Sequence, residues 1–318
     1  MLPTCLKQQQ INNNTHKNNN IVVVVATMAS LATMEPTRLY NLLNQKCLSD
    51  AHYIVLVDAR TPSAYEESHI ITARHAKKDL HGVLTLLYEN ELECKEWCVV
   101  YDNKSQHLDE ESPGVTCARI LEQSRKNVVY VLSGGYERFT ALYPFLRSHK
   151  IIYTPQELDS LFVYPVELIA GCLYLGDANQ ASCACVKKAL KLRAYVSITE
   201  QEGLICDTSD AALLSIPVAE DQGADLFSHF PNICQFIDEA LELKRPVLVF
   251  SQSAISRGCT VAIAYLMHRF KWDLQKSWGH LLQCQRNVRP HRGFVEQLSR
   301  WEFSLHGRGI TNISDPNY

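Results

Sequence analysis

One segment of this chain constrains its fold more than any other: an apolar run, a short polar loop, an arginine and then a helix-forming stretch. The apolar run is Val247-Leu-Val-Phe250, the loop begins at Ser251, and Arg257 follows six residues later. A loop between a buried strand and a helix N-terminus directs backbone N–H groups at one point, where the helix dipole also favours an anion. An arginine at that distance can complete the site with a bidentate hydrogen bond to phosphate oxygens. The segment therefore predicts a phosphate-binding loop in an α/β domain.

The rest of the chain indicates two domains of this class. Its 318 residues suit two domains better than one. Strand and helix candidates alternate in both halves, which predicts parallel sheets with helices on both faces. We expect a disordered or processed leader at residues 1–33, a first domain at 34–150, a second domain at 151–306 and a C-terminal tail at 307–318.

The individual elements follow from hydrophobic spacing and from the positions of proline and glycine. In the first domain we expect strands at 53–57, 97–101 and 128–132, and helices at 35–44, 61–68 and 115–123. In the second we expect strands at 173–175, 194–198, 214–217 and 247–250, and helices at 230–243, 257–268, 273–286 and 293–305. The last helix carries one apolar face, which predicts core packing rather than a binding site.

Further motifs extend the loop signal over residues 171–305. They are Leu173-Tyr-Leu-Gly176, Ile216-Pro-Val218, Phe236-Ile-Asp-Glu-Ala240 and Pro290-His-Arg-Gly-Phe294. Together with the loop they resemble the protein tyrosine and dual-specificity phosphatases, whose loop is His-Cys, five residues, Arg, then Ser or Thr. The resemblance implies a dual-specificity-phosphatase-like α/β fold. It also implies a phosphate-binding loop made of Ser251, Gln252, Ser253, Ala254, Ile255, Ser256 and Arg257.

Four positions depart from that family pattern. The nucleophilic cysteine is Ser251, the preceding histidine is Phe250, the loop glycine is Ala254, and the Ser or Thr after the arginine is Gly258. The family's chemistry needs a thiolate whose pKa the loop lowers. A serine hydroxyl keeps its proton near neutral pH unless a base removes it. The resemblance therefore implies a pseudophosphatase with no intact catalytic set, and it implies neither a metal nor an organic cofactor.

Two other features bear on catalysis. The family's general acid is expected after the Ile216-Pro-Val218 strand, where Glu220 and Asp221 lie. These carboxylates are either a remnant acid or solvated loop charges. Cys259, two residues beyond Arg257, is interpreted as a core thiol, with a substitute nucleophile as the alternative. Weak phosphatase activity through Ser251 or Cys259 thus stays open as a second hypothesis.

The first domain resembles the rhodanese fold over residues 36–148. The motifs are Leu56-Val-Asp-Ala-Arg60, Tyr65-Glu-Glu-Ser-His-Ile70 and Val131-Leu-Ser-Gly-Gly-Tyr-Glu-Arg-Phe139. In active sulfurtransferases the strand that corresponds to Val99-Val-Tyr101 delivers a cysteine into a turn. Here Tyr101-Asp-Asn-Lys104 follows, without a cysteine, so sulfur transfer is not expected.

The same fold precedes the phosphatase domain in mitogen-activated protein kinase phosphatases, where a basic segment with apolar neighbours docks the kinase. Arg74, Lys77 and Lys78, followed by Val83, Leu84 and Leu86, match that description. A docking scaffold that works through this segment is the third hypothesis. A solvated basic turn is the simpler interpretation.

The two domains in this order, with Phe-Ser in place of His-Cys, resemble the serine/threonine/tyrosine-interacting-like group of pseudophosphatases. The resemblance implies a catalytically inactive regulator that binds proteins, including proteins phosphorylated on Ser, Thr or Tyr. It implies roles in stress-granule, apoptosis and neurite signalling, with a stress-granule assembly protein and a mitochondrial phosphatase as partners.

Composition limits the remaining classes. A net charge of −3 and a pI of about 6.5 argue against a nucleic-acid-binding surface. The twelve cysteines lack zinc-site spacing, so buried free thiols in a reducing compartment are favoured over a metal site or a disulfide framework. The apolar run at 21–26 is too short to span a bilayer. We expect a cytoplasmic protein, with the mitochondrial matrix as the alternative because no acidic residue precedes Glu35.

Overall fold

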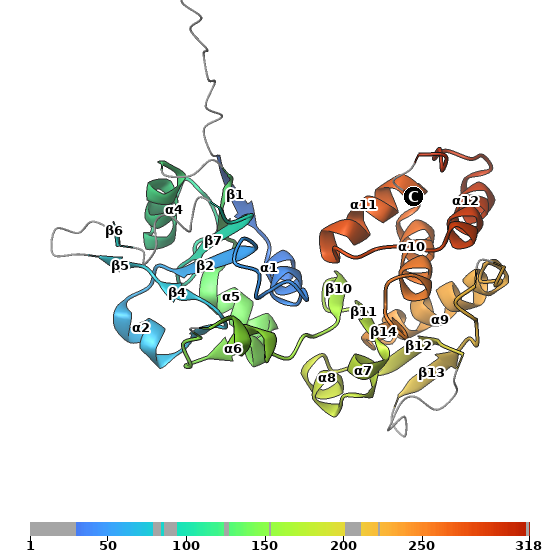
Figure 1. Ribbon diagram of the computed structural model, residues 1–318, viewed down its shortest axis with the longest axis horizontal. Coiled ribbons are helices and arrows are strands. Elements are labelled where there is room, and N and C mark those ends of the chain that lie inside the picture. Colours follow the sequence, from blue (N-terminus) through green and yellow to red (C-terminus); the bar gives the residue numbers. More distant parts are fainter. Residues whose placement is uncertain are drawn as a thin grey trace, which may run out of the picture.

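The computed structural model describes residues 30–78, 84–85, 94–123, 127–152, 154–200, 211–221, 223–315 and 318. Within these residues the chain forms two α/β domains that lie side by side, each built on a five-stranded sheet (Figure 1). The two-domain α/β fold predicted from the sequence is confirmed. The helices and strands predicted for both halves are also present, most of them within a few residues of the expected bounds.

The first domain is organised around a parallel sheet with the strand order β1-β8-β7-β2-β4. These strands are β1 (Leu31–Met34), β2 (Ile54–Asp58), β4 (Arg74–His75), β7 (Trp97–Tyr101) and β8 (Val129–Leu132). The helices are α1 (Pro36–Leu43), α2 (Pro62–Glu67), α4 (Pro113–Gln123), α5 (Gly135–Leu142), the 3-10 turn η1 (Pro144–Leu146) and α6 (Pro155–Asp159), of which α6 lies beyond the domain boundary predicted at residue 150. Two small antiparallel pairs complete it: β3 (His69–Ile70) with β9 (Arg147–Ser148), and β5 (Lys77–Lys78) with β6 (Leu84–Thr85).

The second domain has the strand order β10-β11-β14-β12-β13, in which only the β10–β11 pairing is antiparallel. The strands are β10 (Val166–Ile169), β11 (Leu173–Asp177), β12 (Ala194–Ile198), β13 (Ala212–Ser215) and β14 (Val247–Ser251). The helices are α7 (Ala178–Ser182), α8 (Ala184–Ala189), the 3-10 turn η2 (Phe227–His229), α9 (Phe230–Glu242), α10 (Arg257–Phe270), α11 (Leu274–Cys284) and α12 (Arg292–His306).

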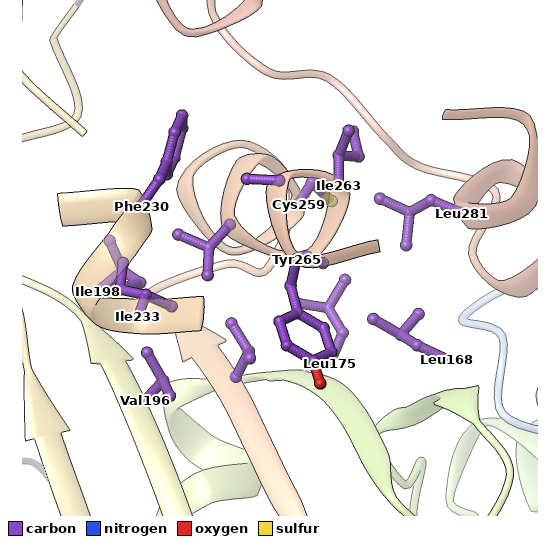
Figure 2. Packing of buried hydrophobic residues seen from close by; sticks show 14 of the residues in the cluster. Leu168, Leu175, Val196, Ile198, Phe230, Ile233, Cys259, Ile263, Tyr265 and Leu281 are labelled. Atoms are coloured by element: carbon purple, nitrogen blue, oxygen red, sulfur yellow. The ribbon is translucent and has the colours of Figure 1, made fainter. Parts of the chain in front are cut away.

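The core of the second domain explains where the polar loop can lie. Every residue of β12 and β14 is buried, as expected for central parallel strands covered on both faces. Helix α10 is buried from Arg257 to Met267 because α9, α11 and α12 all pack against it. Figure 2 shows Tyr265 of this helix pointing toward Leu175 of the sheet, while Ile263 lies on the opposite side of the helix, toward Leu281. The loop between β14 and α10 is thus held between two rigid, fully buried elements.

Helix α1 of the first domain fastens the two domains together through side-chain bonds to backbone atoms of the second. Asn41 Nδ2 donates to Glu167 O (2.8 Å), and Asn41 Oδ1 accepts from Glu167 N (2.7 Å). Tyr40 OH donates to Pro165 O (2.7 Å). Just beyond the helix, Gln45 Nε2 donates to Cys284 O (3.0 Å), and its Oε1 accepts from Arg286 N (3.2 Å). The contact is therefore specific as well as apolar.

Three sequence-based boundaries need correction or comment. Strand β1 begins at Leu31 and pairs with β8, so residues 31–33 belong to the first domain rather than to the leader; residues 1–29 lie outside the described part. Strand β13 begins and ends two residues earlier than predicted. The C-terminal tail is anchored, because Glu302 Oε2 accepts from Ile310 N and Thr311 N (2.8 and 2.9 Å).

Candidate functional site

The loop that follows β14 converges on the side chain of Ser251. Strand β14 ends at Ser251 and helix α10 begins at Arg257, so residues 252–256 connect them. The hydroxyl is buried (the residue is 1% exposed), and its oxygen accepts from Ala254 N and Gly258 N, both at 3.2 Å. The serine oxygen thus occupies the point toward which these loop amides are directed, as the sequence predicts for the nucleophile position.

Ala254 adopts a conformation that favours glycine. Its φ is +57°, in the left-handed region, where a Cβ costs roughly 1–2 kcal/mol. Its carbonyl oxygen accepts from Gln285 Nε2 (2.9 Å) and from Cys259 Sγ (3.1 Å), and these bonds help to hold the turn in place. The sequence identified this alanine as a departure from the family's glycine. The structure adds that the backbone itself takes the shape for which the family uses glycine.

The guanidinium of Arg257 is buried and already engaged from within the protein. Its Nη1 donates to Val218 O (2.5 Å), and its Nε lies 2.5 Å from Glu220 Oε2. The Nε–H does not point along the line to that oxygen, so the contact is an ion pair without hydrogen-bond geometry. Glu200 adds a longer contact, with Oε1 3.6 Å from Nη1. A phosphate group that used Arg257 would have to displace the Glu220 carboxylate.

Of the two carboxylates proposed as a remnant acid, Glu220 faces the site and Asp221 does not. Glu220 Oε1 lies 3.3 Å from His291 Nε2, and its backbone N donates to Glu200 Oε1 (3.1 Å). Asp221 is exposed and accepts from Gly223 N (3.0 Å). His291 in turn donates its backbone N–H to Ser256 Oγ (3.3 Å). Glu220 is therefore a partner of Arg257 at the entrance of the loop, although it is exposed, as Asp221 is.

Other altered positions are part of the packing. Phe250 is fully buried in an apolar cluster, where the family places a histidine. At Gly258 an added Cβ would lie 3.0 Å from Ser251 Oγ and 3.1 Å from Leu175 Cδ1, so a serine there needs small shifts of its neighbours. Cys259 lies in the core of the domain (Figure 2), and burial raises the pKa of its thiol far above the ordinary value. That environment fits a core thiol and disfavours a thiolate nucleophile.

The remaining loop residues divide by exposure. Gln252 and Ser253 are exposed, Ile255 is partly buried, and Ser256 is buried. Sequence reasoning missed Glu200, Gln285 and His291, which contact the loop or its arginine. His291 belongs to a quoted motif, which was its one signal. Neither Glu200 nor Gln285 has a local pattern that connects it with a loop distant in sequence.

The turn after β7 in the first domain contains a second convergence of donors, at Asp102. Its Oδ1 accepts from Lys104 N (3.1 Å) and Ser105 N (2.9 Å), and its Oδ2 accepts from Ser105 Oγ (2.5 Å) and Gly114 N (3.0 Å). Burial alone would raise the pKa of this carboxyl, but the hydrogen bonds from Ser105 and Gly114 outweigh it and lower the pKa below the ordinary value. The turn after β7, where a sulfurtransferase would carry its cysteine, is thus filled by a carboxylate of the chain itself.

The predicted docking segment is only partly described. Arg74 lies on β4 and Lys77 on β5, both exposed, and Lys78 follows on β5. Strand β5 pairs with β6, with Lys78 opposite Leu84, whereas Val83 and Leu86 lie outside the described residues. Kinase docking therefore stays a prediction.

The described residues contain neither a metal-binding cluster nor a membrane-spanning helix. No three His, Cys, Asp or Glu side chains in that part of the chain gather closely enough to hold a metal ion. No helix there is both long enough and apolar enough to cross a membrane.

Comparison with known families matches both halves of the chain. The family model for the catalytic domain of dual specificity phosphatases matches residues 173–304, and the model for the rhodanese-like domain matches residues 35–142. Dual specificity protein phosphatase 4 of Gallus gallus is 27% identical over 312 residues, covering 86% of this chain and 82% of that protein. Dual specificity protein phosphatase Mpk3 of Drosophila melanogaster is 32% identical over 151 residues, covering 47% of this chain. The alignment with Mpk3 covers only 37% of that protein. The alignment with dual specificity protein phosphatase 4 of Homo sapiens covers 57% of that protein, so this chain spans less than two thirds of either relative.

Two solved structures each match less than half of this chain. Human DUSP28 has a TM-score of 0.42 and 26% identity, covering 44% of this chain and 96% of its own. The human tyrosine phosphatase-like serine/threonine/tyrosine-interacting protein has a TM-score of 0.40 and 22% identity, covering 44% and 95%. The two family matches and the long alignment to phosphatase 4 give the conclusion: this chain combines a rhodanese-like domain with a dual-specificity-phosphatase-like domain and is related to the mitogen-activated protein kinase phosphatases.

Proposed function

We propose that this chain is a catalytically inactive, phosphatase-like regulator that binds other proteins, in the manner of the serine/threonine/tyrosine-interacting-like pseudophosphatases. One observation carries the proposal. A serine stands where the nucleophilic thiolate belongs, and its buried oxygen accepts two backbone amides. Such a loop favours an anion, but it offers no group that removes the proton from a hydroxyl.

The surroundings of Ser251 support inactivity further. Both hydrogen bonds described for its oxygen come from amides, and the nearby charged groups engage one another instead. Glu220 pairs with Arg257 and His291, so neither that carboxylate nor that imidazole is bonded to the hydroxyl in the described structure. Cys259, the alternative nucleophile, is buried and has a raised thiol pKa. A weak enzyme that uses either residue is therefore the less favoured alternative.

We propose that Arg257, on the first turn of α10, is the group that holds a phosphate, because the amides of Ala254 and Gly258 already donate to Ser251. A phosphate dianion offers Arg257 two oxygens, whereas the contact described for Glu220 is with Nε. We propose that a phosphorylated Ser, Thr or Tyr side chain enters by displacing the Glu220 carboxylate. The bound phosphoprotein is then retained rather than hydrolysed.

The wider role is proposed from resemblance alone. It comprises stress-granule, apoptosis and neurite signalling, with a stress-granule assembly protein and a mitochondrial phosphatase as partners. The proposed location is the cytoplasm, with the mitochondrial matrix as the alternative. Purification of the tagged chain from cells, followed by identification of the bound proteins and by imaging, tests these points together.

The test of inactivity is hydrolysis of a small aryl phosphate. We expect no turnover by the wild type, and turnover after Ser251→Cys is combined with Phe250→His and Gly258→Ser. The single Ser251→Cys change shows whether the thiol alone is enough. Wild-type turnover that disappears in Ser251→Ala or Cys259→Ser would overturn the proposal and establish the enzyme instead.

The test of binding is capture of phosphotyrosine and phosphothreonine peptides by the wild type, with the unphosphorylated peptides as reference. We expect Arg257→Lys to weaken capture at least tenfold, because a lysine keeps the charge but loses the bidentate fork. Circular dichroism of the variant controls for folding. Equal affinity for phosphorylated and unphosphorylated peptides would show that partners bind elsewhere on the surface.

A further inference from the structure

A pair of cysteines on the second domain has no part in the site described above. Cys183 closes α7 and immediately precedes α8, and Cys185 lies in the first turn of α8. The backbone of Cys183 is fixed on both sides: its N–H donates to Gln180 O (3.2 Å), and its carbonyl accepts from Val186 N (3.1 Å) and Lys187 N (3.2 Å). The corner between the two helices thus holds the two side chains in a defined relation.

The two sulfur atoms face each other. Their separation is 2.7 Å, Cys185 is exposed, and Cys183 is half-buried. A disulfide needs a separation of about 2 Å, so side-chain rotation can form the bond with little backbone movement. The hydrogen bond between the thiols lowers the pKa of Cys183 and raises that of Cys185. The lowered pKa favours Cys183 as the attacking thiol of the pair.

Other described cysteines have different surroundings. Cys98, Cys117 and Cys259 are buried, and burial raises the pKa of Cys234 and of Cys284 to about 12. Buried thiols of this kind react slowly with oxidants. The pair at residues 183 and 185 combines contact between sulfurs, access to solvent and a lowered thiol pKa.

We propose that Cys183 and Cys185 are a redox-active dithiol, which hydrogen peroxide converts reversibly into an intramolecular disulfide. The Cys183 thiolate attacks one peroxide oxygen; the O–O bond breaks, and the hydroxide released takes up a proton to become water. Cys183 is then a sulfenic acid. The Cys185 sulfur attacks it, the S–S bond forms, and the S–O bond breaks with loss of a second water. Two thiols and one peroxide give one disulfide and two waters, and a small dithiol reverses the reaction by exchange.

The pair lies near the junction between the domains. The charges of both cysteines act on Tyr164, whose pKa is raised first by burial and then by Cys185 and Cys183. Tyr164 N donates to Asn44 Oδ1 (2.8 Å), and its ring lies 4.5 Å from that of Phe145. Oxidation removes both titratable thiols beside this contact, so the redox state of the pair is placed to affect how the domains dock.

The test uses the full chain and one equivalent of hydrogen peroxide, followed by blocking of free thiols and mass spectrometry of the peptides. We expect a Cys183–Cys185 link, lighter by two hydrogen atoms, which dithiothreitol reverses. In Cys185→Ser the reaction should stop at a Cys183 sulfenic acid that dimedone traps, whereas Cys94→Ser, a change at another exposed cysteine, should leave the link unaffected.

Two outcomes would overturn the proposal. One is a link from either cysteine to any other thiol of the chain in place of the 183–185 link. The other is alkylation of Cys183 by iodoacetamide near neutral pH no faster than that of Cys94 in the unmodified protein; we expect it to be several-fold faster. The second measurement needs no variant, so it decides the question even if a substitution at the helix corner disturbs folding.

Discussion

Each domain has a turn after a central parallel strand, β7 in the first domain and β14 in the second. In both turns backbone N–H groups converge on one side chain, but the acceptor differs. After β7, the donors converge on the carboxylate of Asp102. After β14, they converge on the neutral hydroxyl of Ser251, and the Glu220 carboxylate pairs with Arg257 instead. In the first turn the anion is the carboxylate of Asp102, a residue of the turn itself, so the N–H groups are not available to a ligand. At the second turn, we propose that the Glu220 side chain gives way to a phosphate group.

The largest expected effect that separates the two turns is on stability. Asp102→Ala leaves the N–H groups of Lys104, Ser105 and Gly114 without their charged acceptor, and we expect a loss of about 4 kcal/mol in the unfolding free energy of the first domain. Ser251→Ala removes a neutral acceptor and should cost about 1 kcal/mol in the second. Denaturant unfolding of both variants measures the difference. Equal losses would show that the charge of Asp102 does not distinguish the turns.

Phosphate affinity should respond at the second turn. Glu220→Gln removes the negative charge that competes for Arg257, and we expect tungstate, a phosphate analogue, to bind about tenfold more tightly, equivalent to about 1.4 kcal/mol. Asp221→Asn is the matched control, because the neighbouring carboxylate is exposed and bonds Gly223 instead. Calorimetric titration gives both constants. An unchanged affinity in Glu220→Gln would mean that the carboxylate does not guard the loop.

The pH dependence of stability should differ between the turns in a defined direction. The pKa of Asp102 is lowered in the folded chain, so its contribution is fully present above the unfolded value of about 3.9 and is lost as the pH falls through the lower, folded value. We therefore expect the stability difference between wild type and Asp102→Asn to be constant at neutral pH and to shrink in strong acid. Ser251→Ala should show no such change over that range. Urea unfolding at several pH values tests this, and a constant difference down to strong acid would contradict it.

The smallest expected effect concerns Ala254. Glycine relieves the left-handed conformation, but it loses a buried methyl group and gains conformational freedom in the unfolded chain. These terms oppose each other, so Ala254→Gly should alter the unfolding free energy by less than about 1 kcal/mol. A large gain in stability would show that the strain of the left-handed conformation at Ala254 outweighs the packing of its methyl group.

Much of this comparison could be predicted from the sequence, because the elements involved are local. The uninterrupted apolar run 247–250 predicted a central strand, and the arginine spacing predicted where α10 begins. The missing cysteine after Tyr101 was equally visible. The role of Asp102 as a hydrogen-bond acceptor could not be predicted, because one of its donors, Gly114, lies at the start of α4.

Other features could not be predicted because they depend on tertiary contacts. The ion pair of Arg257 joins it to residues beyond β12 and β13, and no local pattern indicates which carboxylate reaches it. Strand β1 has four residues and lies at the edge of its sheet, so its pairing with β8 rather than its composition defines it. The sequence shows that Cys183 and Cys185 are two residues apart. Their sulfur contact could not be predicted, because it depends on the corner between two short helices.

The segment at residues 284–286 joins the first domain to the phosphate loop by alternate contacts. Gln45 bonds the backbone of Cys284 and Arg286, while Gln285 between them bonds the carbonyl of Ala254. The position of the first domain and the shape of the loop therefore share one short piece of chain. By thermodynamic reciprocity, any free energy that domain docking adds to anion binding is returned by the anion to docking. A phosphorylated partner would then tighten the whole molecule, and the second domain expressed alone should bind that partner more weakly than the intact chain.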